Sequence, residues 1–245
     1  MLQSRIIPSL LMRDRGLVKT RQFKDEKYIG DPLNAVKIYN EKEVDELAFF
    51  DIDATVKKST PDINLLRTIA KESRMPLCYG GGISDPEQAA DIVKIGFEKV
   101  SISAAALARP DLINEMAARI GRQSVVVTID VKRGLLGGYN IYSHNGTRKH
   151  KPKLADFIAE TTERGAGEIV INSIDQDGMM QGYDLALARL ARDNTTSPLT
   201  ILGGAGESKH MVELIEEVGI VGAAAGSMFV FKGPYRAVLI NYTRP

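Results

Sequence analysis

The sequence predicts an α/β protein with the fold of a (β/α)8 TIM barrel, and two observations lead to this prediction. First, eight short apolar runs alternate with longer amphipathic stretches along the 245 residues, as expected of repeated strand–helix units. Second, the runs 80–83 (GGGI) and 203–206 (GGAG) lie about half a chain apart, and Gly96 and Gly219 follow them at equal distances. We therefore expect one domain, 1–245, built from half-barrels of about 1–120 and 121–245.

The eight predicted strands are short and mostly rich in β-branched residues, as in a parallel sheet that is buried on both faces. In chain order they cover 6–11, 47–50, 76–79, 100–102, 125–129, 169–171, 199–202 and 221–225.

The predicted helices lie between these strands, at 32–42, 61–73, 86–95, 110–119, 153–164, 184–193 and 208–218. Asp31-Pro32, Thr60-Pro61 and Asp85-Pro86 fit a capping residue followed by proline at the first helical position. Segment 137–146 instead alternates polar and apolar residues between turn signals, which predicts a hairpin after the fifth strand.

Composition excludes several classes of function. Lysine and arginine total 32 against 31 acidic residues, so neither nucleic acid nor a membrane surface is expected as a partner. A single cysteine, Cys78, excludes an intramolecular disulfide and a cysteine-based metal cluster. With only three histidines we expect no multi-histidine metal site, and we expect no cofactor. No apolar run approaches the roughly 20 residues of a membrane helix, and we expect a cytoplasmic protein.

Glycine-rich turns are the first candidate sites. In each half, a glycine run follows one strand and a small-residue turn follows the next, at 101–104 (SISA) and 224–227 (AAGS). Bare backbone amides there could bind two phosphates, or one site could be a relic. Glycine could also simply form tight turns. The placement after strands 7 and 8 favours phosphate binding in the second half.

Carboxylates at the ends of strands are the second candidates, because the carboxyl ends of barrel strands face the active site. Asp51 and Asp53 follow the second strand, Asp130 the fifth, and Asp175 and Asp177 the sixth. Each could be a general acid or base, or could cap a helix or fix a loop. Asp130 is hardest to explain structurally, because it directly extends an apolar strand.

Charges at the starts of strands form a third set: Arg5, Glu46, Lys99 and Glu168. They are predicted to face the bottom of the barrel. Spacing alone favours a role in stability or in a solvated rim.

Many ordered motifs resemble the cyclase (synthase) subunit of imidazole glycerol phosphate synthase along nearly the full chain. The resemblance implies a two-fold repeated barrel that receives ammonia from a glutaminase docked at its bottom face, through a gate matched by Arg5, Glu46, Lys99 and Glu168. The matching stretches are 5–7 (RII), 18–19 (VK), 30–32 (GDP), 45–47 (DEL), 50–52 (FDI), 80–83 (GGGI), 99–102 (KVSI), 124–127 (SVVV), 129–130 (ID), 164–169 (RGAGEI), 173–175 (SID), 177–178 (DG), 182–184 (GYD) and 203–206 (GGAG).

The resemblance also implies which residues act at the top face. Of the family's two catalytic aspartates, Asp130 matches the second, but Leu11 stands at the first. The phosphate-contacting Asn-Thr pair is replaced by Ser103-Ala104. The implied residues for substrate and phosphate binding are Lys19, Asp51, Gly82, Ser101, Ser103, Asp177, Gly178, Gly204, Gly226 and Ser227.

These departures are shared by cyclase-like paralogues of acetamidino-sugar formation, which the chain resembles at 17–20 (LVKT), 28–32 (YIGDP), 40–47 (NEKEVDEL), 142–146 (YSHNG) and 233–242 (GPYRAVLINY). That group implies ammonia supply to an ATP-dependent amidotransferase acting on a surface-polysaccharide sugar. Two alternatives remain open: an active cyclase of histidine biosynthesis, which makes imidazole glycerol phosphate and an aminoimidazole carboxamide nucleotide, and a scaffold that only activates the glutaminase.

Overall fold

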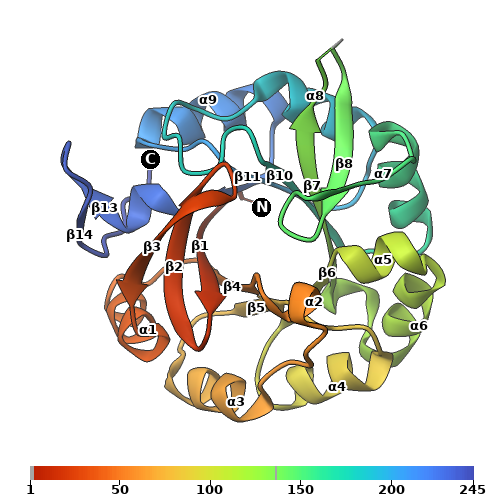
Figure 1. Ribbon diagram of the computed structural model, residues 1–245, viewed down its shortest axis with the longest axis horizontal. Coiled ribbons are helices and arrows are strands. Elements are labelled where there is room, and N and C mark those ends of the chain that lie inside the picture. The colour runs from red at the N-terminus through yellow and green to blue at the C-terminus, as the bar shows by residue number, and fades with distance from the viewer. Residues whose placement is uncertain (1–2, 136) are drawn as a thin grey trace.

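A closed barrel of eight parallel strands forms the centre of the molecule (Figure 1). The computed structural model describes residues 3–135 and 137–245. Around the barrel the strands run in chain order, and β10 closes the circle by pairing with β7. The strands are β1 (Arg5–Arg13), β4 (Leu47–Asp51), β5 (Leu77–Gly80), β6 (Lys99–Ile102), β7 (Val125–Arg133), β10 (Glu168–Ser173), β11 (Leu199–Leu202) and β12 (Gly222–Ala225). The predicted fold class is confirmed.

Helices surround the barrel on the outside (Figure 1). The predicted helices are α1 (Pro32–Glu41), α3 (Ile63–Glu72), α4 (Pro86–Lys94), α6 (Asp111–Ile120), α7 (Leu154–Glu163), α8 (Leu185–Asp193) and α9 (Ser208–Val218). Two short helices that the sequence analysis missed, α2 (Ala54–Lys57) and α5 (Ala104–Ala108), follow β4 and β6. Across residues 3–135 and 137–245, none of the helices has the length and apolar character needed to cross a bilayer.

The last strand is followed by a different structure. After β12 the chain forms a short 3-10 helix, η2 (Ser227–Phe229), and a small hairpin, β13 (Phe231–Lys232) and β14 (Ala237–Val238). Figure 1 shows this hairpin at the edge of the molecule, between α9 and α1. The eighth strand thus lacks the long covering helix of the other units.

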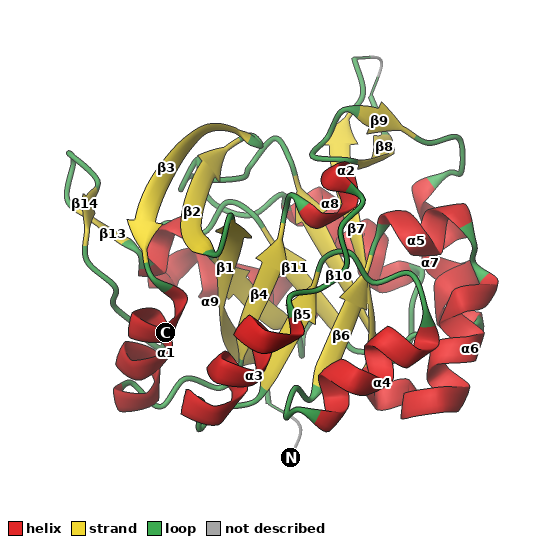
Figure 2. Ribbon diagram, turned by 60° about the horizontal axis from the view of Figure 1, so that its bottom comes forward, coloured by secondary structure: helices red, strands yellow, loops and turns green. Residues whose placement is uncertain are grey.

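Two hairpins rise from the top of the barrel, opposite the end at which the N-terminus lies (Figure 2). The predicted one is β8 (Tyr139–Ser143) with β9 (Arg148–Lys149), paired to the end of β7. The other, β2 (Gly16–Arg21) with β3 (Lys24–Gly30), was not predicted. Its turn residues Gln22 and Phe23 have positive φ of 50° and 63°. Positive φ in such turns is usually signalled by Asn or Gly, which are absent here.

The barrel strands of the two halves correspond to one another. The first strand of each half, β1 and β7, has nine residues and continues into an antiparallel hairpin above the barrel. The third and fourth strands have four residues in both halves. The structure therefore agrees with the repeat that the glycine runs predict.

Side-chain caps explain where several helices begin. Asp31 accepts hydrogen bonds from the Leu33 and Asn34 amides, and Asp85 accepts one from Glu87, with proline next in the chain in both cases. The predicted start at Thr60-Pro61 is wrong, because α3 begins at Ile63. Asp62 caps it by accepting from the amide of Leu65, and a carboxylate is a strong acceptor at that position.

Apolar packing occupies two regions. One core lies between the barrel and its surrounding helices. The other is small and lies inside the barrel, where inward-facing side chains of several strands meet. The buried members of this inner core are Ile7, Ala48, Cys78, Val126, Val170, Leu202 and Ala224.

Candidate functional site

A cavity of about 570 Å³ opens at the top of the barrel. Strand ends, the following loops and the turns of both hairpins line it. Predicted site residues among its lining are Asp51, Gly82, Ser101, Ser103 and Asp130. The sequence analysis therefore identified much of one cavity from residues far apart in the chain.

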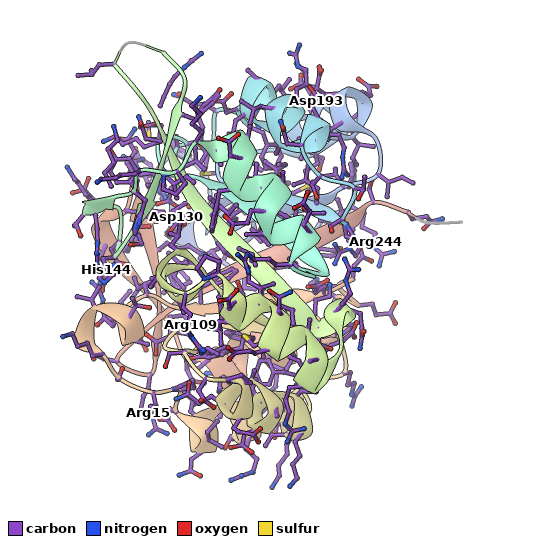
Figure 3. All side chains as sticks on the ribbon, turned by 90° about the vertical axis from the view of Figure 1, so that its right-hand side faces the viewer. Arg15, Arg109, Asp130, His144, Asp193 and Arg244 are labelled. Atoms are coloured by element: carbon purple, nitrogen blue, oxygen red, sulfur yellow. The ribbon has the colours of Figure 1, made fainter. Side chains whose placement is uncertain are left out.

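Asp130 lies in this cavity on β7, at the register position of Asn172 on β10. The Asn172 amide donates a hydrogen bond of 2.9 Å to its carboxylate. Burial raises the pKa of Asp130 to about 7, against the opposing effect of that hydrogen bond. Such a carboxyl group changes protonation near neutral pH, as a general acid or base should. In Figure 3, Asp130 lies deeper in the molecule than His144, which is on the hairpin turn.

The sequence analysis did not select Asn172. It directly follows the apolar run 169–171 and is a polar residue where the next inward-facing side chain of that strand is expected. A polar residue at this inward-facing position is the sequence feature that could have identified Asn172 as part of the site.

Leu11 lines the same cavity. At the end of β1 it pairs in register with Val18 of the adjoining hairpin and with Phe50 of β4. An isobutyl side chain can neither transfer a proton nor accept a hydrogen bond. Of the two acid positions that the resemblance implies, only the one at Asp130 therefore carries a titratable group.

Asp51 has a local structural role. One of its carboxylate oxygens accepts hydrogen bonds of 3.0 Å from the amides of Asp53 and Ala54, at the start of α2. The structural alternative considered for this residue, capping of the next helix, is thus observed. Contact with a substrate stays a prediction for Asp51.

The first-half cluster contains one unsatisfied hydroxyl. Ser101 shares a 2.6 Å hydrogen bond with Thr128, both buried in the barrel. The Ser103 hydroxyl is buried and has no hydrogen-bond partner among the residues that the structure describes. Gly82 has φ of +70°, and a Cβ there would lie 2.4 Å from the Ser59 carbonyl oxygen. The turn thus requires glycine whether or not a phosphate binds.

The second-half cluster surrounds a narrow pocket beside the main cavity. It brings together the predicted residues Lys19, Asp177, Gly178, Gly204, Gly226 and Ser227. Leu11, Phe23, Asn172 and Leu202 line both spaces, so the pocket adjoins the main cavity.

Lys19 is the buried cation of this pocket, with 4% of its surface exposed. Its ammonium group donates to the carbonyl of Ser9. Burial lowers the pKa of Lys19 to about 8, although the nearby Asp177 acts in the opposite direction. A Cβ on Gly226 would lie 2.6 Å from the lysine nitrogen, so glycine at 226 makes room for the ammonium group.

Asp177 links this pocket to the unpredicted hairpin. Its carboxylate accepts hydrogen bonds from the Thr20 hydroxyl at 2.6 Å and the Phe23 amide at 3.1 Å. Burial raises its pKa, against these two hydrogen bonds. Gly178 has φ of +67°, and a Cβ there would lie 2.1 Å from the Thr20 carbonyl oxygen, so glycine is needed where this loop passes the hairpin. Asp177 therefore anchors the β2–β3 hairpin over the pocket.

The four charged residues predicted at the barrel bottom meet in one ring. Arg5 donates to Glu46 and, at 2.7 Å, to Glu168. Lys99 donates to Glu46 at 2.7 Å and to Glu168 at 2.9 Å. Thr200, a polar residue within a buried strand that the sequence analysis passed over, adds a 2.5 Å hydrogen bond to Glu168. Each carboxylate thus bridges both cations.

The ring is largely buried, with the Glu46 and Glu168 side chains 6% and 5% exposed. Burial opposes ionisation of Glu168, but Lys99 and Arg5 lower its pKa to about 2. Burial and the charge of Glu168 raise the pKa of Glu46. The ring crosses the barrel bottom below the apolar inner core, and its role as an ammonia gate stays a prediction.

Comparisons with known proteins agree with this geometry. The family model described as "Histidine biosynthesis protein" matches residues 5–235. A Leptospira borgpetersenii protein, named provisionally as imidazole glycerol phosphate synthase subunit HisF, is 53% identical over 99% of this chain and 96% of its own length. A Vibrio vulnificus protein, named provisionally as subunit hisF3, is 53% identical over 100% of this chain and 95% of its own.

The imidazole glycerol phosphate synthase subunit HisF of Thermotoga sp. (strain RQ2) is 39% identical over 95% of this chain and 91% of its own length. The chain belongs to the histidine biosynthesis family, as a cyclase-type subunit like those of imidazole glycerol phosphate synthase.

Proposed function

We propose that this chain accepts ammonia from a glutaminase subunit docked at the bottom of the barrel and passes it through the core, in the cytoplasm. The ammonia then serves the amidination of a surface-polysaccharide sugar by an ATP-dependent amidotransferase. The ring of Arg5, Glu46, Lys99 and Glu168 is the observation that carries this proposal.

The ring supports an entrance because its ion pairs are shared. Each carboxylate contacts both Arg5 and Lys99, so one cation can move aside while the other still compensates the buried charge. Loss of all compensation would be costly, because a buried unpaired charge destabilises the fold. A small neutral molecule can therefore be admitted without unfolding of the ring.

The barrel interior above the ring supports the passage of neutral ammonia. Apolar side chains of the inner core surround this region, among them Ile7, Ala48, Val126 and Val170. An ammonium ion would lose its hydration there at a large free-energy cost, whereas neutral ammonia would lose far less. The hydroxyls of Ser101 and Thr128 lie above, where ammonia would reach the top cavity.

Leu11 favours sugar amidination over the cyclisation of histidine biosynthesis. Acid–base catalysis by one positioned group contributes about 10² to 10⁴ in rate, and Leu11 supplies no such group. Asp130 alone, with its pKa near neutrality, remains as an acid or base. The second-half pocket with Lys19 would hold a phosphorylated small-molecule ligand.

Replacement of Lys99 tests the entrance. The chain, its glutaminase and the sugar amidotransferase are reconstituted, and amidination is measured with glutamine and with ammonium chloride. In Lys99→Ala, the glutamine-dependent rate should fall several-fold relative to the ammonia-dependent rate, because the ring no longer has its second bridging cation. Circular dichroism checks that the barrel remains folded.

Lys71→Ala, on the exposed face of α3, is the matched control and should leave the ratio of the two rates unchanged. If Lys99→Ala also leaves it unchanged, the ring is not the entrance and its charges serve stability alone. Formation of imidazole glycerol phosphate in place of an amidinated sugar would assign the chain to histidine biosynthesis. Stimulation of glutaminase without any ammonia transfer would assign it the role of a scaffold.

A further inference from the structure

The C-terminal hairpin β13–β14 lies beside strand β3 at the top of the molecule (Figures 1 and 2). The Lys27 ammonium group on β3 donates a 3.0 Å hydrogen bond to the carbonyl of Arg236, in the hairpin turn. Lys27 also lies 5.2 Å from the ring centre of Phe231. The family model matches residues 5–235, so its match ends one residue before Arg236.

Arg236 reaches from this hairpin to the second-half pocket. Its guanidinium group donates to the Gly178 carbonyl at 3.0 Å and to the Ser227 hydroxyl at 3.3 Å. Both Gly178 and Ser227 line the pocket. The guanidinium also stacks on Phe231, 4.4 Å from the ring centre. These contacts hold a planar cation in one orientation at the rim of the pocket.

Both cations at the pocket retain donors for a ligand. A guanidinium group has five N–H donors and an ammonium group three. Arg236 uses two in the contacts just described. Within residues 3–135 and 137–245, the Ser9 carbonyl is the one hydrogen-bond acceptor that the Lys19 ammonium contacts. Phosphate, with several acceptor oxygens, fits such a set of donors.

The balance of charge also favours an anion. Lys19 and Arg236 both interact with the carboxylate of Asp177, and that carboxylate already accepts bonds from Thr20 and Phe23. Arg21 adds a further positive charge. Burial lowers the pKa of Arg236, and repulsion by Arg21 lowers it further. Positive charge around the pocket thus exceeds the negative charge that compensates it.

We propose that Arg236 is a further ligand-binding residue, which binds a phosphate ester together with Lys19 in the second-half pocket. The proposal rests on the phosphate-binding role proposed above for this cluster. The phosphate occupies the narrow pocket, and the rest of the ligand extends past Leu11 and Leu202 into the main cavity, because these residues line both spaces. Arg236 thereby selects phosphorylated ligands over neutral ones.

Binding of glycerol 3-phosphate and inorganic phosphate, measured by calorimetry near pH 7.5, tests this proposal, with glycerol as the neutral comparison. Arg236→Ala should raise the dissociation constant of glycerol 3-phosphate by about tenfold or more, because hydrogen bonds to charged groups are strong. Arg236→Lys keeps the charge but not the planar fork, and should give an intermediate value. Lys232→Ala, an exposed cation on the same hairpin, should bind as the unsubstituted chain does.

Thermal unfolding in phosphate-free buffer checks that the variants are folded, and Arg236→Lys provides the comparison if Arg236→Ala is not. Equal affinity of Arg236→Ala and the unsubstituted chain would overturn the role of Arg236. If Lys19→Met abolished binding while Arg236→Ala left it unchanged, the pocket would bind phosphate through Lys19 and without Arg236. Absence of binding by the unsubstituted chain would overturn both the role of Arg236 and the phosphate-binding role of the second-half pocket. The assay contains no glutaminase, so none of these outcomes depends on the ammonia channel.

Discussion

At the scale of single residues, the top cavity contains one titratable group where the family resemblance implies two. Asp130 is held by Asn172 and surrounded by protein, which raises the pKa of its carboxyl group to about 7. Leu11 occupies the other position with an apolar side chain. Chemistry that needs a separate acid and base on opposite sides of a substrate is therefore not available from these two residues alone.

The raised pKa of Asp130 predicts how stability depends on pH. Its folded-state pKa of about 7 lies above the ordinary value of 3.8, so the native state binds more protons between these values. The contribution of protonated Asp130 to stability is therefore fully present below pH 3.8 and is lost as the pH rises through 7. Asp130→Asn removes this loss and should be more stable than the unsubstituted protein at pH 8, by roughly 4 kcal/mol at about 1.36 kcal/mol per pKa unit.

Denaturant unfolding at pH 4 and pH 8 measures this difference. Asp193→Asn, an exposed aspartate at the end of α8, is the control and should follow the pH dependence of the unsubstituted protein. If Asp130→Asn follows it too, Asp130 ionises in the folded protein as it does in water, and its assignment as an acid or base weakens.

At the scale of elements, the two hairpins above the barrel complete the site. The β8–β9 turn supplies His144 and Asn145 to the cavity, and the β2–β3 turn supplies Phe23. Neither hairpin belongs to the closed circle of eight strands. The β2–β3 hairpin is attached through β1 and through the bonds of Thr20 and Phe23 to Asp177. Its position thus depends on a loop from the other half of the barrel.

Loss of the Thr20 hydroxyl should loosen this hairpin. Thr20→Val keeps the side-chain shape but removes the 2.6 Å hydrogen bond to Asp177. Amide hydrogen exchange in residues 16–30 should rise several-fold, because local opening requires less free energy when a buried hydrogen bond is lost. Exchange in the core strands should not change.

Asp175→Asn is the matched comparison, because the Asp175 carboxylate accepts from the Arg133 amide at 2.7 Å. Its effect should appear at the end of β7 and in the β8–β9 hairpin. Unchanged exchange of residues 16–30 in Thr20→Val would show that pairing with β1 alone holds the hairpin.

At the scale of the whole molecule, the charged ring joins the two half-barrels. Arg5, Glu46 and Lys99 come from the first half, and Glu168 comes from the second. Because each cation contacts both carboxylates, removal of one member leaves the others incompletely compensated. The same contacts that would gate ammonia thus also contribute to the closure of the barrel.

Glu168→Gln should therefore destabilise the protein at pH 7 by roughly 3 kcal/mol, as for other broken buried ion pairs. The pKa of Glu168 is lowered to about 2 from 4.5, so its contribution is present above pH 4.5 and is lost as the pH falls toward 2. The variant should accordingly lose less stability over this interval than the unsubstituted protein.

Denaturant unfolding between pH 7 and pH 2 measures both effects, with Glu163→Gln, at the exposed end of α7, as control. Equal losses in Glu168→Gln and Glu163→Gln below pH 4.5 would show that the ring does not hold Glu168 ionised.

The sequence by itself determined the barrel strands, most of the helices and the half-length repeat, because buried apolar runs and capping residues followed by proline are local patterns. The convergence of strand ends on the two faces of a barrel also indicated the ring residues and Asp177, and the family resemblance added Lys19. Glycine-rich turns marked where the backbone adopts positive φ, as at Gly178 and Gly204.

Only the tertiary structure decided how these residues are used. The caps of Asp51 and the anchoring bonds of Asp177 depend on which backbone amides lie within reach. The β2–β3 hairpin carries no glycine or asparagine in its turn, so no local pattern predicted it. Arg236 reaches the pocket because a hairpin folds back beside β3. These contacts join segments far apart in the chain, and their geometry is set by packing rather than by neighbours in sequence.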